Sequence, residues 1–147
     1  MIDRFQEILH ALGEELNIPL EPDRNHACAI QVKPGLIVQL ETDPSQEKLL
    51  ILSPIIEIPP GKFRENVLRE GLKSNALPDP RIGVLSYIPK INKLVLFQYY
   101  PFDILTAERL AGLLGAFIET AGKWRDAITN GNPGPLPEAP PLHGFRP

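Results

Sequence analysis

Residues 48–61 read KLLILSPIIEIPPG, and they mark a change from strand to helix. The first half is apolar at consecutive positions, which is typical of a strand that is covered on both faces or awaits a partner. The run Pro59-Pro60-Gly61 then breaks the chain. Beyond it, apolar residues recur at helical spacing, and one side of the predicted helix carries Phe63, Val67, Leu68 and Leu72. The stretch therefore predicts a strand over residues 48–58 followed by a helix.

On the N-terminal side of this stretch, the sequence predicts one helix and two strands. The helix has apolar residues at i, i+3, i+4 and i+7 from Phe5 to Leu16, and Asp3 is placed to cap it. In residues 27–32 and 36–41, a wholly apolar set of side chains alternates with a mixed set that includes Gln31, Gln39 and Glu41, and Pro34-Gly35 marks the turn between the two strands. Turns this short indicate antiparallel neighbours.

On the C-terminal side, Asn75 is the predicted C-cap of the helix that begins after Gly61. Two further strands are predicted over residues 82–88 and 93–100. A last helix then begins after Asp103 or Thr106, either of which can cap it. The order helix, three strands, helix, two strands, helix predicts an α+β fold with a mostly antiparallel, twisted sheet.

The composition predicts one domain over residues 1–130 and a disordered tail over residues 131–147. The chain has 17 prolines among 147 residues, and many of them lie in the tail, where no apolar period is found. Six prolines fall in the last fifteen residues: Pro133, Pro135, Pro137, Pro140, Pro141 and Pro147. Such a tail can also serve as a polyproline ligand for an aromatic groove.

Charge and cysteine content narrow the function classes. The net charge of −3 argues against nucleic-acid binding, and the start lacks the basic end and apolar stretch of a signal peptide. No stretch is long and apolar enough for a membrane span, so we expect a cytoplasmic protein. The single Cys28 excludes an intramolecular disulfide, and Cys28 with His26 supplies too few ligands for structural zinc. We therefore predict no catalytic, cofactor or metal site and expect a protein that is not an enzyme.

The apolar surface exceeds what three helices can easily cover. The predicted strands at 48–58 and 93–100 are apolar on both faces, and an exposed apolar surface normally marks an interface. We expect one surface for self-association and another for a polypeptide partner. The alternative is a monomer with a large, ordinary core.

The order and lengths of these segments resemble the class I type III secretion chaperones of the Tir chaperone (CesT-like) family. The resemblance is carried by the helix motif FQEILHALG at 5–13, the Leu-rich strand ending at Pro59, LREGLKSNAL at 68–77, IGV at 82–84, KLVL at 93–96 and AGKW at 121–124. It implies an α-β-β-β-α-β-β-α fold and a homodimer without a cofactor. It also implies that the chain binds the N-terminal chaperone-binding segment of a secreted effector and keeps it soluble for secretion.

The resemblance further implies two sets of site residues. In the family, the second helix and the fourth strand form the dimer contact, which corresponds here to Val67, Leu68, Leu72, Val84, Ser86 and Ile88. Effector grooves use the first helix and the sheet, which corresponds here to Phe5, Leu9, Leu12, Val38, Leu40 and Ile51. Two alternatives stay open: an adaptor of the same fold that binds a secretion or transcription regulator, and a small-ligand carrier.

Overall fold

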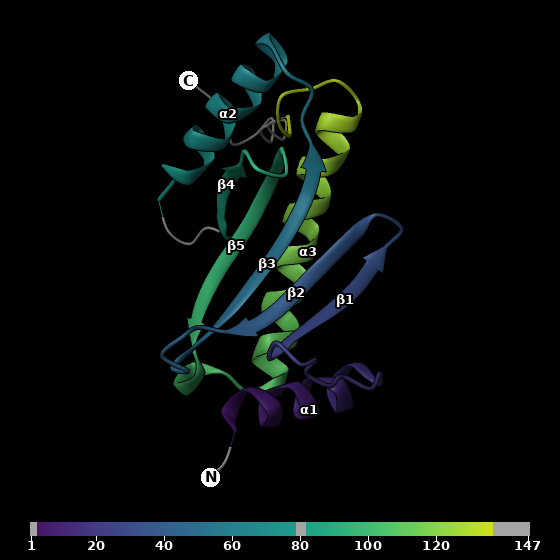
Figure 1. The fold of residues 1–147 in the computed structure, drawn as a ribbon, viewed down its shortest axis with the longest axis vertical. Coiled ribbons are helices and arrows are strands. Elements are labelled where there is room, and N and C mark those ends of the chain that lie inside the picture. Colours follow the sequence, from purple (N-terminus) through teal and green to yellow (C-terminus); the bar gives the residue numbers. More distant parts are fainter. Residues whose placement is uncertain (1–2, 79–81, 137–147) are drawn as a thin grey trace, which may run out of the picture.

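A five-stranded antiparallel sheet forms the centre of the computed structural model, which describes residues 3–78 and 82–136 (Figure 1). The strands lie in the order β1-β2-β3-β5-β4, and their bounds are β1 Ala27–Lys33, β2 Leu36–Thr42, β3 Lys48–Glu57, β4 Val84–Ile88 and β5 Lys93–Pro101. The helices are α1 Arg4–Leu16, α2 Lys62–Asn75 and α3 Ala107–Thr129, with a short 3-10 turn η1 at Phe102–Ile104. The predicted element order and the α+β class are confirmed.

Helices α1 and α3 begin at polar caps, whereas α2 begins at Gly61 without a side-chain cap. The Asp3 carboxylate accepts a hydrogen bond from the Gln6 backbone N–H at 3.2 Å, as predicted for the start of α1. Of the two candidate caps for α3, Thr106 fills the position, because its hydroxyl accepts from the Arg109 N–H at 3.1 Å. Asp103 lies instead in η1, where it pairs with Arg4 and ties the start of α1 to the start of α3.

Strand β3 lies at the centre of the sheet between β2 and β5, and its sequence explains why its pairing with β2 is the shorter one. It pairs with β5 along almost its whole length, but its pairing with β2 ends at Leu52. Pro54, which has no N–H to donate, therefore lies where β2 no longer runs beside the strand, and the β5 register shifts just after it. The buried Ser53 hydroxyl donates to the Ile37 carbonyl at 2.8 Å, which satisfies its only polar group.

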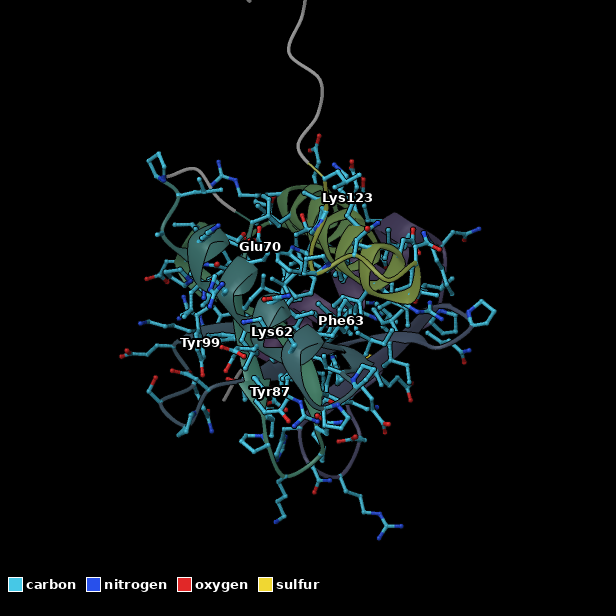
Figure 2. The ribbon with its side chains drawn as sticks, turned by 90° about the horizontal axis from the view of Figure 1, so that it is seen from above. Lys62, Phe63, Glu70, Tyr87, Tyr99 and Lys123 are labelled. Atoms are coloured by element: carbon cyan, nitrogen blue, oxygen red, sulfur yellow. The ribbon has the colours of Figure 1, made fainter. Side chains whose placement is uncertain are left out.

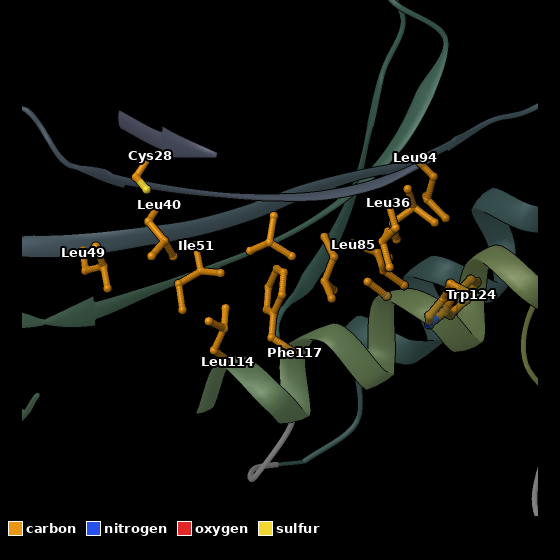
Figure 3. Close-up of a cluster of buried hydrophobic side chains, with 14 of the residues drawn as sticks. Cys28, Leu36, Leu40, Leu49, Ile51, Leu85, Leu94, Leu114, Phe117 and Trp124 are labelled. Atoms are coloured by element: carbon orange, nitrogen blue, oxygen red, sulfur yellow. The ribbon is translucent and has the colours of Figure 1, made fainter. Parts of the chain in front are cut away.

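The core lies between one face of the sheet and helix α3. We call this face, which carries Leu36, Val38, Leu40, Leu49, Ile51, Leu85 and Leu96, the inner face. In Figure 3, Leu114, Phe117 and Trp124 of α3 point toward it. Helix α1 lies across one end of the sheet and α2 lies at the other end, beside β4 (Figure 1). Phe5, Leu9 and Leu12 of α1 complete the same core.

Helix α2 is joined to the sheet edge by a side chain whose role the sequence did not reveal. Asn75 was predicted to cap α2, but it is the last helical residue and Ala76 occupies the C-cap position. The Asn75 amide instead donates to the Leu85 carbonyl and accepts from the Leu85 N–H, both at 2.8 Å. It thereby takes up the outward-facing backbone groups of Leu85, as a neighbouring strand would.

The residues just after α3 turn back onto the domain. The Asn132 N–H donates to the Ala127 carbonyl at 2.8 Å, and Gly134 is buried. A β-carbon at Gly134 would lie 3.1 Å from the Trp124 ring and 3.2 Å from Glu70 Cβ, so the chain passes tightly between α3 and α2. Viewed from above, Glu70 lies on the side of α2 nearer α3 (Figure 2). The predicted disordered tail therefore starts with packed residues, and its remainder, 137–147, lies outside the described residues.

Candidate partner-binding surfaces

The face of the sheet opposite α3, which we call the outer face, carries no helix in the described part of the chain (Figure 1). It is mostly apolar over β3, β5 and β4, whereas over β1 and β2 it also carries Gln31, Gln39 and Glu41. Residues that are paired across the strands share a face, so the registers define this surface. Its apolar residues are Ile37, Leu50, Leu52, Val84, Ile88, Val95, Phe97 and Tyr99. Ile37 and Tyr99 are each 44% exposed, and Phe97 packs edge-on against Tyr99 with ring centroids 6.3 Å apart. This surface is the surplus apolar area that the sequence predicted.

At each edge of the sheet, another part of the chain occupies the outward backbone groups of one strand residue. At the β4 edge, Asn75 occupies the outward groups of Leu85. At the β1 edge, the Ala27 N–H donates to the Asp23 carboxylate and its carbonyl accepts from the Asp23 N–H, so the backbone groups of Ala27 face away from β2. Because every second residue of a strand faces the same way, the groups of Ala29 and Gln31 also face outward. Within residues 3–78 and 82–136 they have no partner, so the β1 edge is open.

A second apolar surface lies between α2 and β4. An open groove of about 290 Å³ is lined by Leu68, Gly71, Leu72, Leu85, Ser86, Tyr87 and Leu94. Leu72 is 71% exposed, whereas Gly71 beside it is buried next to Leu85. At the start of α2, the Arg64 guanidinium lies 5.6 Å from the centroid of the Tyr87 ring. Figure 2 labels Tyr87 and, at the start of the helix, Lys62. The groove thus combines an apolar floor with a charged end.

Residues 7–125 match the model of the Tir chaperone protein (CesT) family. The chain belongs to this family. The match spans α1 to most of α3 and contains both the outer face and the α2–β4 groove. A comparison with curated protein sequences found no match.

Several solved structures share the CesT-family fold of this chain at low sequence identity. A chain in the HopA1–SchA chaperone–effector complex has a TM-score of 0.70 and 19% identity, and the alignment covers 84% of this chain and 94% of that one. A chain in the ExoT–SpcS complex from Pseudomonas aeruginosa has a TM-score of 0.64 and 18% identity over 83% and 97%. A chain in the Yersinia pestis structure of the type III secretion chaperone SycH with a YscM2 fragment has a TM-score of 0.62 and 15% identity over 80% and 97%. These likenesses establish the fold.

The residues that the family resemblance assigned to an effector groove lie in the core. Phe5, Leu9, Leu12, Val38, Leu40 and Ile51 are all at most 2% exposed. The alternation of side chains along a strand separates the residues of the two faces of the sheet, but it does not show which face a helix covers. The strand residues assigned to the groove belong to the inner face, which α3 covers. Their neighbours along the strands lie on the outer face, where Ile37 is 44% exposed and Leu52 is half-buried.

The residues that the family resemblance assigned to a dimer contact differ in how far they are exposed. Val67 is fully buried and packs into the core, so it offers no surface. Leu68 and Val84 are half-buried, whereas Ser86 is exposed and Ile88 is 39% exposed. Together with Leu72, Leu68 and Ser86 line the α2–β4 groove, while Val84 and Ile88 lie on the adjoining outer face.

The structure does not bring Cys28 and His26 together into a reactive pair or a metal site. Cys28 is buried in β1, and burial raises the pKa of its thiol, which keeps it protonated and unreactive. His26 lies outside the strand in a left-handed turn at φ 57°, so the two side chains do not form a pair on one strand face. The search of the described residues found no group of three His, Cys, Asp or Glu side chains suited to a metal ion.

A polar depression of about 460 Å³ lies where α1 meets the ends of β1 and β2. Its carboxylates have structural partners, since Asp3 caps α1 and Asp43 holds the β2–β3 turn. No helix among residues 3–78 and 82–136 is long and apolar enough to cross a membrane.

Proposed function

We propose that this protein is a type III secretion chaperone. In the bacterial cytoplasm it holds an N-terminal segment of a secreted effector in extended form and keeps the effector soluble for export. The observation that carries the proposal is an outer face that is mostly apolar over β3, β5 and β4, together with an open strand edge at β1. Membership of the Tir chaperone family supports it, as does the likeness to chains in chaperone–effector complexes.

The two features suit an extended segment because they supply affinity in different ways. A strand added to β1 pairs with the outward backbone groups of Ala29 and Gln31, which gives hydrogen bonds that do not depend on side chains. Apolar side chains of the bound segment and of its continuation cover the outer face. Ordering an unfolded segment costs about 2–5 kcal/mol or more, so a large apolar contact is required to offset it. The protein acts by binding alone and catalyses no reaction.

The proposal is tested with outer-face variants and a matched control. Ile37→Asp and Tyr99→Asp each place a charge on the outer face at a position that is 44% exposed, so the fold tolerates them. Ile104→Asp places the same charge at a position that is 46% exposed in η1, away from this face. We expect the two outer-face variants to lose a secreted protein that wild type and Ile104→Asp retain in purification from the native host.

The identity of the retained protein is then decisive. Removing its N-terminal segment is expected to abolish binding, and deleting the gene of this chaperone is expected to abolish its secretion. Retention through a folded C-terminal domain would favour the adaptor alternative, and a bound small molecule would favour the carrier alternative. Equal retention by all four proteins would refute the role of the outer face.

We also propose that two copies associate through the α2–β4 groove. Its most exposed apolar residue, Leu72, has 71% of its surface open to solvent, which makes it costly to leave uncovered in a monomer. Leu72→Asp leaves the fold intact, because the side chain contributes little to the core, but it places an unpaired charge in the interface. Light scattering is expected to give twice 16.4 kDa for wild type and 16.4 kDa for the variant. A mass that is the same in both refutes this interface.

A further inference from the structure

Two cations stand at the end of the open β1 edge without an acidic partner. The register of β1 shifts between Gln31 and Lys33, and Lys33, the last residue of the strand, is paired with the buried Leu36. Beyond this shift its side chain faces the inner side of the sheet, as that of Val32 does. Its Nζ atom lies 3.7 Å from the place that a β-carbon of Gly122 would occupy on α3. The Arg125 guanidinium lies over Gly35 in the β1–β2 turn, with an Nη atom 2.6 Å from the place of a Gly35 β-carbon.

The two cations lie on the same side of α3, because Gly122 and Arg125 are three residues apart on that helix. The ion pairs of the described residues involve other cations, for example Lys123 with Glu119 and Arg4 with Asp103. Neither Lys33 nor Arg125 has a carboxylate partner among those residues. The chain as a whole carries a net charge of −3, so this cationic site contrasts with its surroundings.

Apolar side chains at the margin of the core lie next to Lys33 in the sequence of β1. On the inner side of β1, Ile30 and Val32 are half-buried and pack against the core at its margin, as does Ile118 of α3. A strand added at this edge directs alternate side chains inward. One inward side chain falls beside Ile30 or Val32, and an inward side chain two residues further along falls beside Lys33 and Arg125.

We propose that the segment bound at the β1 edge carries an acidic side chain two residues from an apolar one, and that Lys33 and Arg125 bind this carboxylate. This inference rests on the proposed function, and it specifies a sequence pattern that the bound segment should contain. The apolar side chain extends the core margin at Ile30 and Val32. The carboxylate accepts charge-assisted hydrogen bonds from a guanidinium and an ammonium group.

The test uses a library of displayed ten-residue peptides selected against the full chain. We expect the selected peptides to share an apolar–any–Asp/Glu pattern. In a synthetic peptide of this pattern, replacing the acid by its amide is expected to weaken binding about tenfold at low salt, as for a hydrogen bond to a charged group. Raising the ionic strength from about 0.01 to 1 M shortens the screening length from about 30 to 3 Å and is expected to remove most of this preference.

Variants assign the preference to the two cations. Arg125→Gln and Lys33→Gln should each reduce the difference between the acid and amide peptides. Lys123→Gln is the control, since Lys123 is on the same helix but pairs with Glu119 at 3.4 Å, and it should leave the difference unchanged. Thermal melting checks that each variant is folded.

The outcomes separate this inference from the proposed function. If no peptide binds the wild-type protein, both are refuted. If peptides bind without any preference for an acidic residue, the inference is refuted and the proposed function stands. An acidic preference that is unchanged in both Arg125→Gln and Lys33→Gln also refutes the inference.

Discussion

Replacing Asn75 by alanine tests the link between α2 and the sheet edge. The Asn75 amide makes two hydrogen bonds of 2.8 Å to the backbone of Leu85. At about 1 kcal/mol each, their loss destabilises the protein by about 2 kcal/mol. Alanine has a higher helix propensity than asparagine, which returns about 0.6 kcal/mol. The net loss of about 1.4 kcal/mol corresponds to a fall in melting temperature of about 4 °C for a chain of this size.

Asn66→Ala is the matched control for this prediction. Asn66 is half-buried on the same helix, and the structure gives it no hydrogen bond to another described residue. Asn66→Ala therefore receives the same gain in helix propensity without the loss, and the two variants should differ by about 2 kcal/mol. Thermal melting measures this difference in stability. Hydrogen exchange at the Leu85 amide should become faster in Asn75→Ala only, which would show that the loss arises at this hydrogen bond. Equal melting temperatures and unchanged exchange at Leu85 would refute the idea that Asn75 holds this edge.

Two further predictions concern the tail and the β2–β3 turn. Removing residues 132–147 should lower the melting temperature by a few degrees more than removing 137–147, because only the longer deletion removes the packing of Gly134 on Trp124; equal temperatures would contradict this. The Ser45 hydroxyl and the Glu47 and Lys48 amides hold the pKa of Asp43 below its usual range. Its contribution to stability should therefore be complete above about pH 4 and should be lost as the pH falls through the lowered pKa. The titration of Asp43 by NMR and the acid limb of stability in Asp43→Asn check this, and a normal pKa would contradict it.

The elements of the fold were predictable because each depends on local signals. The cap at Asp3, the turn at Pro34-Gly35 and the switch of period after Pro59 lie within a few residues of the structure that they determine. The assignment of side chains to a partner surface was not predictable in this way. In β3, Leu50 and Ile51 are adjacent and both apolar, yet Ile51 is fully buried beneath α3 and Leu50 is on the outer face.

The role of Asn75 was hidden for a related reason. From the sequence, an asparagine at the end of a helix indicates a cap. Its actual partner, Leu85, is ten residues away, and only the packing of α2 beside β4 brings the two together. Gly134 is a similar case, because its proline-rich neighbours indicate an extended and solvated chain while the contact with Trp124 depends on the tertiary arrangement.

The two edges of the sheet offer different kinds of contact to another polypeptide. At β4, Asn75 of the chain's own α2 occupies the outward groups of Leu85, and the helix places apolar side chains such as Leu72 beside this edge. At β1, the outward groups of Ala29 and Gln31 stay open, so an extended segment can pair with the backbone. A dimer formed through the α2–β4 groove leaves both β1 edges free. Self-association and partner binding then do not compete, and each copy can hold part of the same bound segment.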